Sequence, residues 1–210
     1  IADQEPPSIT FDNPVFEDWY QPTALGRIEL SGVITSTGCA LTSQMPIQMS
    51  LLSNENGTLI LEGDGRFTYR TVLNDGTYQL NSILRDRAGN EAEIAYDFNV
   101  DSQGPILDLI VPGVRQVSNQ STLVITIEGE DIGSGLLNTS GMVNGDFGEA
   151  PLTATLLDGL SQRYELSTAL ELSPGEHSLT ITVSDQVGNL SDLAINYIRD
   201  IIPPTATIVS

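Results

Sequence analysis

The stretch Asp86-Arg-Ala-Gly89-Asn90 recurs 99 residues later as Asp185-Gln-Val-Gly188-Asn189. The match continues without a gap into a segment of alternating apolar residues, where Ile94 corresponds to Leu193, Tyr96 to Ile195, Phe98 to Tyr197 and Pro105 to Pro204. An internal repeat of this length predicts two structural units of the same fold.

A third copy of the repeat begins near the end of the chain. The pattern Asp-x-x-x-Pro occurs at 3–7, 101–105 and 200–204, and alternating apolar residues follow each occurrence. We therefore predict one domain over residues 1–101, a second over 102–200, and the start of a following repeat over 201–210. The chain is expected to be part of a longer protein.

Each unit is predicted to be all-β. Apolar residues alternate with polar ones, as half-buried strands require, at Leu123, Ile125 and Ile127 and again at Leu179, Ile181 and Val183. Turn-forming residues separate the strands, as in 74–76 and 173–175. About 100 residues with such short strands favour two tandem immunoglobulin-like Greek-key β-sandwich domains, plus the first strand of a third. A β-barrel is the alternative.

The order of these motifs resembles a known family. The pattern Asp-x-x-Gly-Asn, then a strand, then Asp-x-x-x-Pro opening the next strand is similar to the bacterial immunoglobulin-like (Big-type) tandem repeats of large cell-surface adhesins. The resemblance covers the second half of both units and all three linkers, and is weaker over residues 12–75. It implies an extracellular, cell-surface location and a role as extender or stalk modules, in some of which calcium stiffens the joints.

Composition narrows the possible partners. The net charge is −20 and the isoelectric point is near 4.1, so the surface repels phosphate backbones and anionic lipid, and no nucleic-acid partner is expected. No apolar run approaches the roughly 18 residues of a membrane helix, so no membrane insertion is expected. With Cys39 as the single cysteine, the chain cannot form an internal disulfide.

Enzymatic residues are scarce. His177 is the only histidine and aligns with Tyr78 of the other repeat, which indicates strand packing rather than catalysis. Ser-His-Asp and zinc arrangements therefore lack their components. Acidic pairs for glycoside hydrolysis exist by count, but acidic residues concentrate in turns. We predict that the chain is not an enzyme.

Calcium is the cofactor that the turns suggest. In an immunoglobulin-like sandwich the linker entering a domain, the turn between its second and third strands and the turn between its last two strands lie at one end. In the second unit these segments carry Asp101, then Glu130 and Asp131, then Asp185 and Asn189. Calcium prefers six to eight such oxygen ligands. The prediction is that Asp101, Asp131 and Asp185 share one ion.

Two alternatives to this metal site stay open. Asp185 could simply cap its turn, with Asn189 following a glycine of positive φ. A second-choice site in the first unit comprises Asp3, Glu5, Asp86 and Asn90, but the corresponding turn at 36–40 offers no carboxylate.

The atypical aromatic segment, residues 11–22, is the least repeat-like part of the chain. It contains Trp19, the only tryptophan, next to Tyr20. An exposed aromatic cluster would suit binding of a glycan or protein, whereas a buried one would fill the core of the first domain.

Three functions are compatible with these patterns. The first is a non-catalytic extender of a secreted bacterial surface adhesin, whose partners are the neighbouring repeats of the same chain, and this chain is expected to be a monomer. The second is a glycan- or protein-binding module in the first domain, which would engage a host or surface ligand. The third is an accessory domain pair of a secreted hydrolase.

Overall fold

The computed structural model describes residues 4–12, 19–23, 26–36, 44–50, 55–61, 65–113, 115–158 and 163–206. All regular structure in these ranges is β, and no helix long and apolar enough to cross a membrane occurs in them. Contacts divide the chain into two compact units, Ile1–Ser102 and Gln103–Ser210. The division falls one residue after the predicted boundary at 101.

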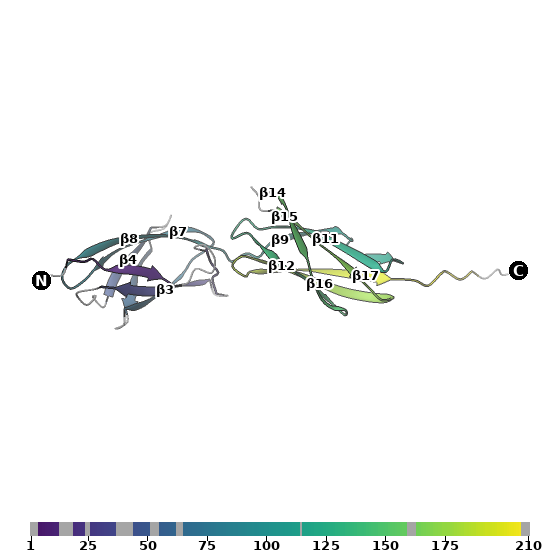
Figure 1. Ribbon diagram of the computed structural model, residues 1–210, viewed down its shortest axis with the longest axis horizontal. Coiled ribbons are helices and arrows are strands. Elements are labelled where there is room, and N and C mark those ends of the chain that lie inside the picture. Colours follow the sequence, from purple (N-terminus) through teal and green to yellow (C-terminus); the bar gives the residue numbers. More distant parts are fainter. Residues whose placement is uncertain are drawn as a thin grey trace. The chain divides into compact units, whose positions relative to one another are not determined.

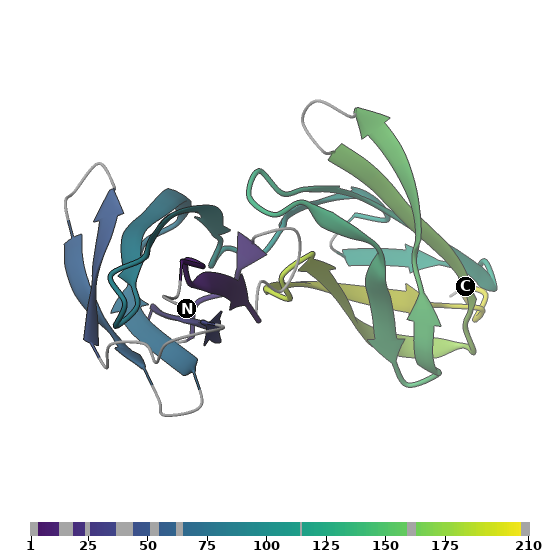
Figure 2. The same cartoon turned by 60° about the vertical axis from the view of Figure 1, so that its left-hand side comes forward.

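The second unit is a sandwich of two sheets, and the strands within each sheet are mostly antiparallel (Figures 1 and 2). One sheet has the order β14-β15-β11-β9, and the other has the order β10-β17-β16-β12-β13. Only β10 runs parallel to its neighbour, β17. The strands are β9 (Ile106–Val111), β10 (Arg115–Ser118), β11 (Thr122–Glu130), β12 (Leu136–Gly145), β13 (Gly148–Pro151), β14 (Thr153–Asp158), β15 (Arg163–Glu171), β16 (Gly175–Asp185) and β17 (Leu190–Arg199).

The first unit has the same chain path, but its strands form one continuous hydrogen-bonded order, β1-β3-β6-β5-β4-β7-β8-β2. Continuity arises because β5 pairs with both β4 and β6, and so connects the two layers at one edge. The strands are β1 (Ser8–Phe11), β2 (Trp19–Tyr20), β3 (Arg27–Thr35), β4 (Gln44–Ser50), β5 (Glu55–Leu61), β6 (Arg66–Val72), β7 (Gly76–Arg85) and β8 (Glu91–Val100).

Alternating burial along the strands builds the core of each unit. In β11, Leu123, Ile125 and Ile127 are buried while the residues between them face outward. They pack against the equally alternating Leu179, Ile181 and Val183 of β16, because successive side chains of a strand point to opposite faces of the sheet. The prediction of tandem all-β, immunoglobulin-like sandwiches is therefore confirmed.

The beginning of a third repeat is not formed as a strand in the described residues. Residues 201–206 have no strand assignment and are exposed, and the remaining apolar position of the pattern, Ile208, lies outside the described residues.

Candidate cation site

The turn between β16 and β17 is built around the carboxylate of Asp185. Its Oδ1 accepts hydrogen bonds from the backbone N–H groups of Val187 at 3.0 Å, Gly188 at 2.7 Å and Asn189 at 2.8 Å. Gly188 has φ of 95°, a conformation that costs little only without a Cβ. These contacts within the turn are therefore sufficient to explain an aspartate at position 185.

The side chain of Asn189 joins this turn to the segment that enters β9. Its Nδ2 donates to Asp185 Oδ2 at 2.7 Å and to the backbone carbonyl of Gln103 at 3.2 Å. The entering segment lies so close that a Cβ on Gly104 would stand 2.5 Å from the carbonyl oxygen of Leu190. Residues 103 and 104 are thus held against the β16–β17 turn by backbone contact.

A second loop reaches the same end of the unit from the other sheet. Asp131 directly follows β11, and its Oδ2 accepts a hydrogen bond from the N–H of Gly135, which has φ of 85°. The carbonyl of Gly135 in turn accepts a 2.8 Å hydrogen bond from the N–H of Gln186. The β11–β12 loop is therefore fastened to the β16–β17 turn.

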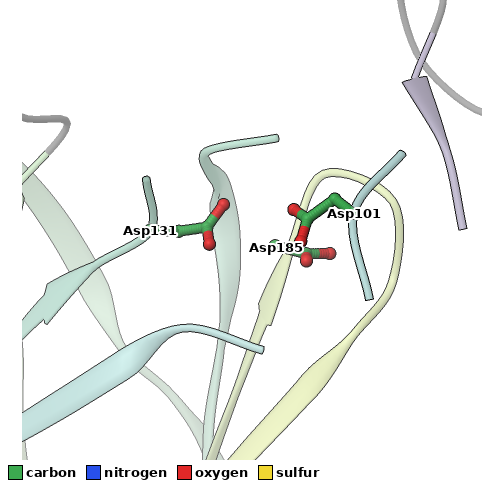
Figure 3. Close-up of side chains that lie close together, drawn as sticks. All are labelled: Asp101, Asp131 and Asp185. Carbon is green, nitrogen blue, oxygen red and sulfur yellow. The ribbon is translucent and has the colours of Figure 1, made fainter. Parts of the chain in front are cut away.

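Three carboxylates converge here: Asp101, Asp131 and Asp185 (Figure 3), which we call the carboxylate trio. One oxygen from each lies within 4.8 Å of the others. The three residues are only 2%, 4% and 1% exposed, respectively. Ionised carboxylates that lie this close together and this deeply buried repel one another unless a cation or a proton compensates their charge. Hard divalent cations that prefer carboxylate and carbonyl oxygens, such as Ca²⁺, suit this donor set.

Asp101 stands on the connecting segment, directly after β8 and two residues before Gln103. Its N–H donates to the carbonyl of Tyr20 at 3.1 Å. Asp101 therefore bonds within the first unit through its main chain, whereas Gln103 and Gly104 contact residues of the second unit.

Two other predicted ligands have different positions. Glu130 is half-buried and is not part of the trio. As the last residue of β11 it alternates with the buried Gly129 and lies on the outward face with Glu128, which pairs with Arg163. The amide group of Asn189 is directed at Asp185 and Gln103 rather than at the trio as a whole.

The first unit repeats the turn, and its described residues form no corresponding group of three carboxylates. Asp86 is buried, and its carboxylate accepts from the N–H of Asn90 at 2.9 Å and from Asn90 Nδ2 at 2.8 Å. Asn90 Nδ2 also donates to the carbonyl of Glu5 at 3.3 Å, as Asn189 does to Gln103. The side chain of Glu5 is exposed. Asp3, the remaining second-choice ligand, lies outside the described residues.

The turn alone alters the acidity of its aspartate. Loss of hydration on burial raises the pKa of Asp86. Hydrogen bonds from the Asn90 side chain and from the N–H groups of Asn90, Gly89 and Ala88 lower it by more. The net effect places the pKa below its ordinary value of 3.8.

The residue that follows the nine-residue strand, β3 in the first unit and β11 in the second, distinguishes the two units. Ser36 follows β3 as Asp131 follows β11, since each strand is nine residues long and begins the same way relative to the core. The buried Oγ of Ser36 makes no hydrogen bond within the described part of the chain. Where the second unit has a third carboxylate, the first unit therefore has a hydroxyl group.

The described aromatic residues of the segment 11–22 contribute mainly to the core. Tyr20 is 3% exposed, and its ring meets Phe98 edge to face with centroids 5.5 Å apart. Phe11 stacks on Tyr96 at 4.1 Å. Trp19 is half-buried in the two-residue strand β2. Tyr20, predicted as a possible ligand contact, presents no exposed ring face.

Sequence reasoning did not identify the backbone groups that assemble this end of the unit. The carbonyls of Gln103 and Gly135 connect three segments, yet main-chain groups occur at every position and give no residue-type signal. Gly104 and Gly135 are the sequence features that could have indicated them, through a close approach and a positive φ.

Comparison with known proteins gives structural neighbours only. No family model matches the chain, and no curated protein matches it. The fibronectin(III)-like modules of Clostridium thermocellum CbhA are similar over 96% of this chain and 100% of theirs, with 14% identity and a TM-score of 0.49.

Two adhesin structures are also similar. A 1.5-MDa bacterial ice-binding adhesin is matched over 93% of this chain and 65% of that one, with 12% identity and a TM-score of 0.42. A tetra-tandem repeat from the extending region of a large adhesion protein is matched over 87% and 48%, with 20% identity and a TM-score of 0.36. At these scores the likenesses assign no activity.

Proposed function

We propose that the chain is a pair of non-catalytic spacer repeats of an extracellular bacterial surface protein, in which Ca²⁺ at the carboxylate trio stiffens the connection into the second unit. Support comes from the tandem arrangement: two complete sandwiches follow one another through a short linker that ends in the buried Pro105. Proline restricts both itself and the preceding residue to extended geometry. The partners of each unit are then its neighbours in the same chain.

The observation that carries the calcium proposal is the convergence of Asp101, Asp131 and Asp185 from three separate segments. Asp185 is explained by its turn, because Asp86 occupies an equivalent turn in the first unit. Asp131 has no such equivalent, since Ser36 stands at its position. A buried third carboxylate beside two others adds repulsion, which a divalent cation would offset.

A cation at this position would act on the connecting segment. Asp101 belongs to that segment, whereas Asp131 and Asp185 belong to loops of the second unit. Ligation of all three would therefore restrict rotation of the chain between Asp101 and Gln103. A spacer gains reach from such restriction, because a stiff connection keeps successive units extended.

Thermal unfolding of the 210-residue chain with calcium and with chelator tests the proposal. An ion that binds only the folded state adds about 2.7 kcal/mol at a concentration 100-fold above Kd. For a domain of about 100 residues this raises the Tm of the second unit by about 10–20 °C. Asp131→Asn keeps the shape of the side chain and removes its charge, so the calcium-dependent shift should be lost.

The matched control is Asp108→Asn, which removes an exposed carboxylate from β9 of the same unit. This variant should retain the full calcium shift. Equal melting of the wild-type chain with calcium and with chelator would contradict the cation proposal. Small-angle scattering in both conditions then tests the mechanical role, which predicts a narrower range of extended shapes with calcium.

A further inference from the structure

The start of the penultimate strand of each unit carries a side chain that binds the preceding turn. In the first unit Tyr78 donates its hydroxyl to the carbonyl of Asn74 at 2.6 Å. This is the tyrosine corner found in immunoglobulin-like domains. In the second unit the equivalent residue is His177, whose Nε2 lies 2.8 Å from the carbonyl oxygen of Ser173. The same contact, to the residue four positions earlier, is thus made by a phenol in one unit and an imidazole in the other.

The imidazole of His177 has a second partner. Its Nδ1 lies 2.9 Å and 3.1 Å from the two carboxylate oxygens of Asp146, in the turn between β12 and β13. A carbonyl and a carboxylate can only accept hydrogen bonds. A neutral imidazole carries one N–H, so one of its nitrogens would direct a lone pair at an acceptor. Only the imidazolium, with two N–H groups, donates to both.

Among the described residues, the other charged groups near this corner do not supply an alternative partner for the ring. Asp146 is the carboxylate that pairs with His177, and its own side chain is 59% exposed. Glu176, the preceding residue, is exposed on the opposite face of β16. On β17, Tyr197 lies opposite His177, and Arg199 lies opposite Gly175 and donates to the carbonyl of Leu172 at 2.7 Å. Glu149 of β13 is exposed.

The balance of these surroundings favours the charged ring. Burial, at 4% exposure, lowers the pKa of His177. The hydrogen bond to Asp146, the hydrogen bond to the Ser173 carbonyl and the charge of Asp146 raise it, and the net effect places the pKa above its ordinary value of 6.5.

We propose that His177 is a proton-binding clamp: the folded second unit holds a proton on this ring, which fastens the turn before β16 and the β12–β13 turn to the strand, and loss of the proton loosens both. The clamp lies at the end of β16 opposite Asp185, so it acts independently of the carboxylate trio. Tyr78 gives the first unit no equivalent sensitivity, since a phenol ordinarily keeps its proton up to about pH 10.

The direction of the pH effect follows from the raised pKa. A group that binds its proton more tightly in the folded state stabilises that state fully below pH 6.5, the ordinary value. The stabilisation is lost as pH rises through the folded-state pKa. The second unit should therefore weaken on going from mildly acidic to mildly alkaline solution.

The chain contains one histidine, so nuclear magnetic resonance of the whole chain reports on this ring without assignment. In chelator, the titration midpoint of the folded His177 signal should lie above 6.5. Asp146→Asn should lower the midpoint, and the control Asp108→Asn should leave it in place. A midpoint at or below 6.5, or one that Asp146→Asn does not change, overturns the proposal.

Stability gives a second measurement. In urea, the folded and unfolded resonances of His177 measure the fraction of folded second unit, which should fall as pH rises from 6 to 9. His177→Tyr introduces the residue of the first unit, and its unfolding midpoint, followed by tyrosine resonances, should vary less with pH. If this variant does not fold, the wild-type and Asp146→Asn titrations still decide, because Asp146 is exposed and its replacement spares the core. Wild-type stability that is constant over this range contradicts the clamp.

Discussion

The two units share the Asp-x-x-Gly-Asn turn but differ in what surrounds it. In both, a buried aspartate caps the turn and an asparagine amide bonds the entering segment, through Glu5 in one and Gln103 in the other. Within the described residues, an aspartate, Asp131, stands beside the turn of the second unit at the position where the first unit has Ser36. The comparison separates a structural role of the motif, present in both units, from the proposed cation-binding role, which requires an additional residue.

The largest expected effect concerns the role that both units share. Asp185→Ala removes the acceptor for three backbone N–H groups and the Asn189 amide. We expect a loss of about 3 kcal/mol or more, because buried donors without partners are costly. Asp86→Ala should destabilise the first unit in the same direction. Urea unfolding in chelator measures both, and tolerance of Asp185→Ala would show that the turn does not depend on its cap.

Asp131→Asn should abolish the calcium-dependent stability that is proposed to distinguish the second unit from the first. With calcium the variant should be less stable than the wild type by up to the about 2.7 kcal/mol that a saturating ion contributes. In chelator at low salt it should be equally stable or more stable, because one of three repelling charges is gone. Urea unfolding in the two conditions gives the sign in each. Destabilisation by the same amount in both would assign Asp131 a purely structural role.

The asparagine amides should have smaller, matched effects. Asn189→Ala and Asn90→Ala each remove a bond to the capping aspartate and a bond to the entering segment. A loss of about 1–2 kcal/mol is expected for the more deeply buried Asn189. Unfolding of the two variants side by side measures whether the entering segment is fastened alike in both units. A large loss in one variant alone would contradict the shared role.

Acid should expose the smallest effect, at Asp86. Its lowered pKa means that its ionised form stabilises the folded first unit above pH 3.8, and that this contribution disappears as pH falls through the lower folded-state pKa. Asp86→Asn should flatten this part of the stability curve. Acid titration of the unfolding midpoint for both chains provides the check, and identical curves would count against ionised Asp86 as a stabilising group.

Much of the fold followed from the sequence because the signals were local and periodic. The alternation at Leu123, Ile125 and Ile127 specified a half-buried strand, and the repeat specified two units. The continuous sheet of the first unit was not predictable in this way. It depends on β5 pairing with both of its neighbours, a long-range register that no local pattern encodes.

The candidate site was predictable in part for a topological reason. Strand direction alone brings Asp101, Asp131 and Asp185 to one end, and the structure places them together. Glu130 was included because of its charge, but a shift of one residue along a strand reverses the face of a side chain. The two hydrogen-bonding partners of the His177 imidazole could not be predicted, since Asp146 is 31 residues away in the chain.

Calorimetric titration of Ca²⁺ into the metal-free 210-residue chain tests the central claim most directly. We predict binding of one ion per chain, lost in Asp131→Asn and retained in Asp108→Asn. Absence of binding to the wild-type chain, or equal binding to the Asp131→Asn variant, would contradict the carboxylate trio as a calcium site.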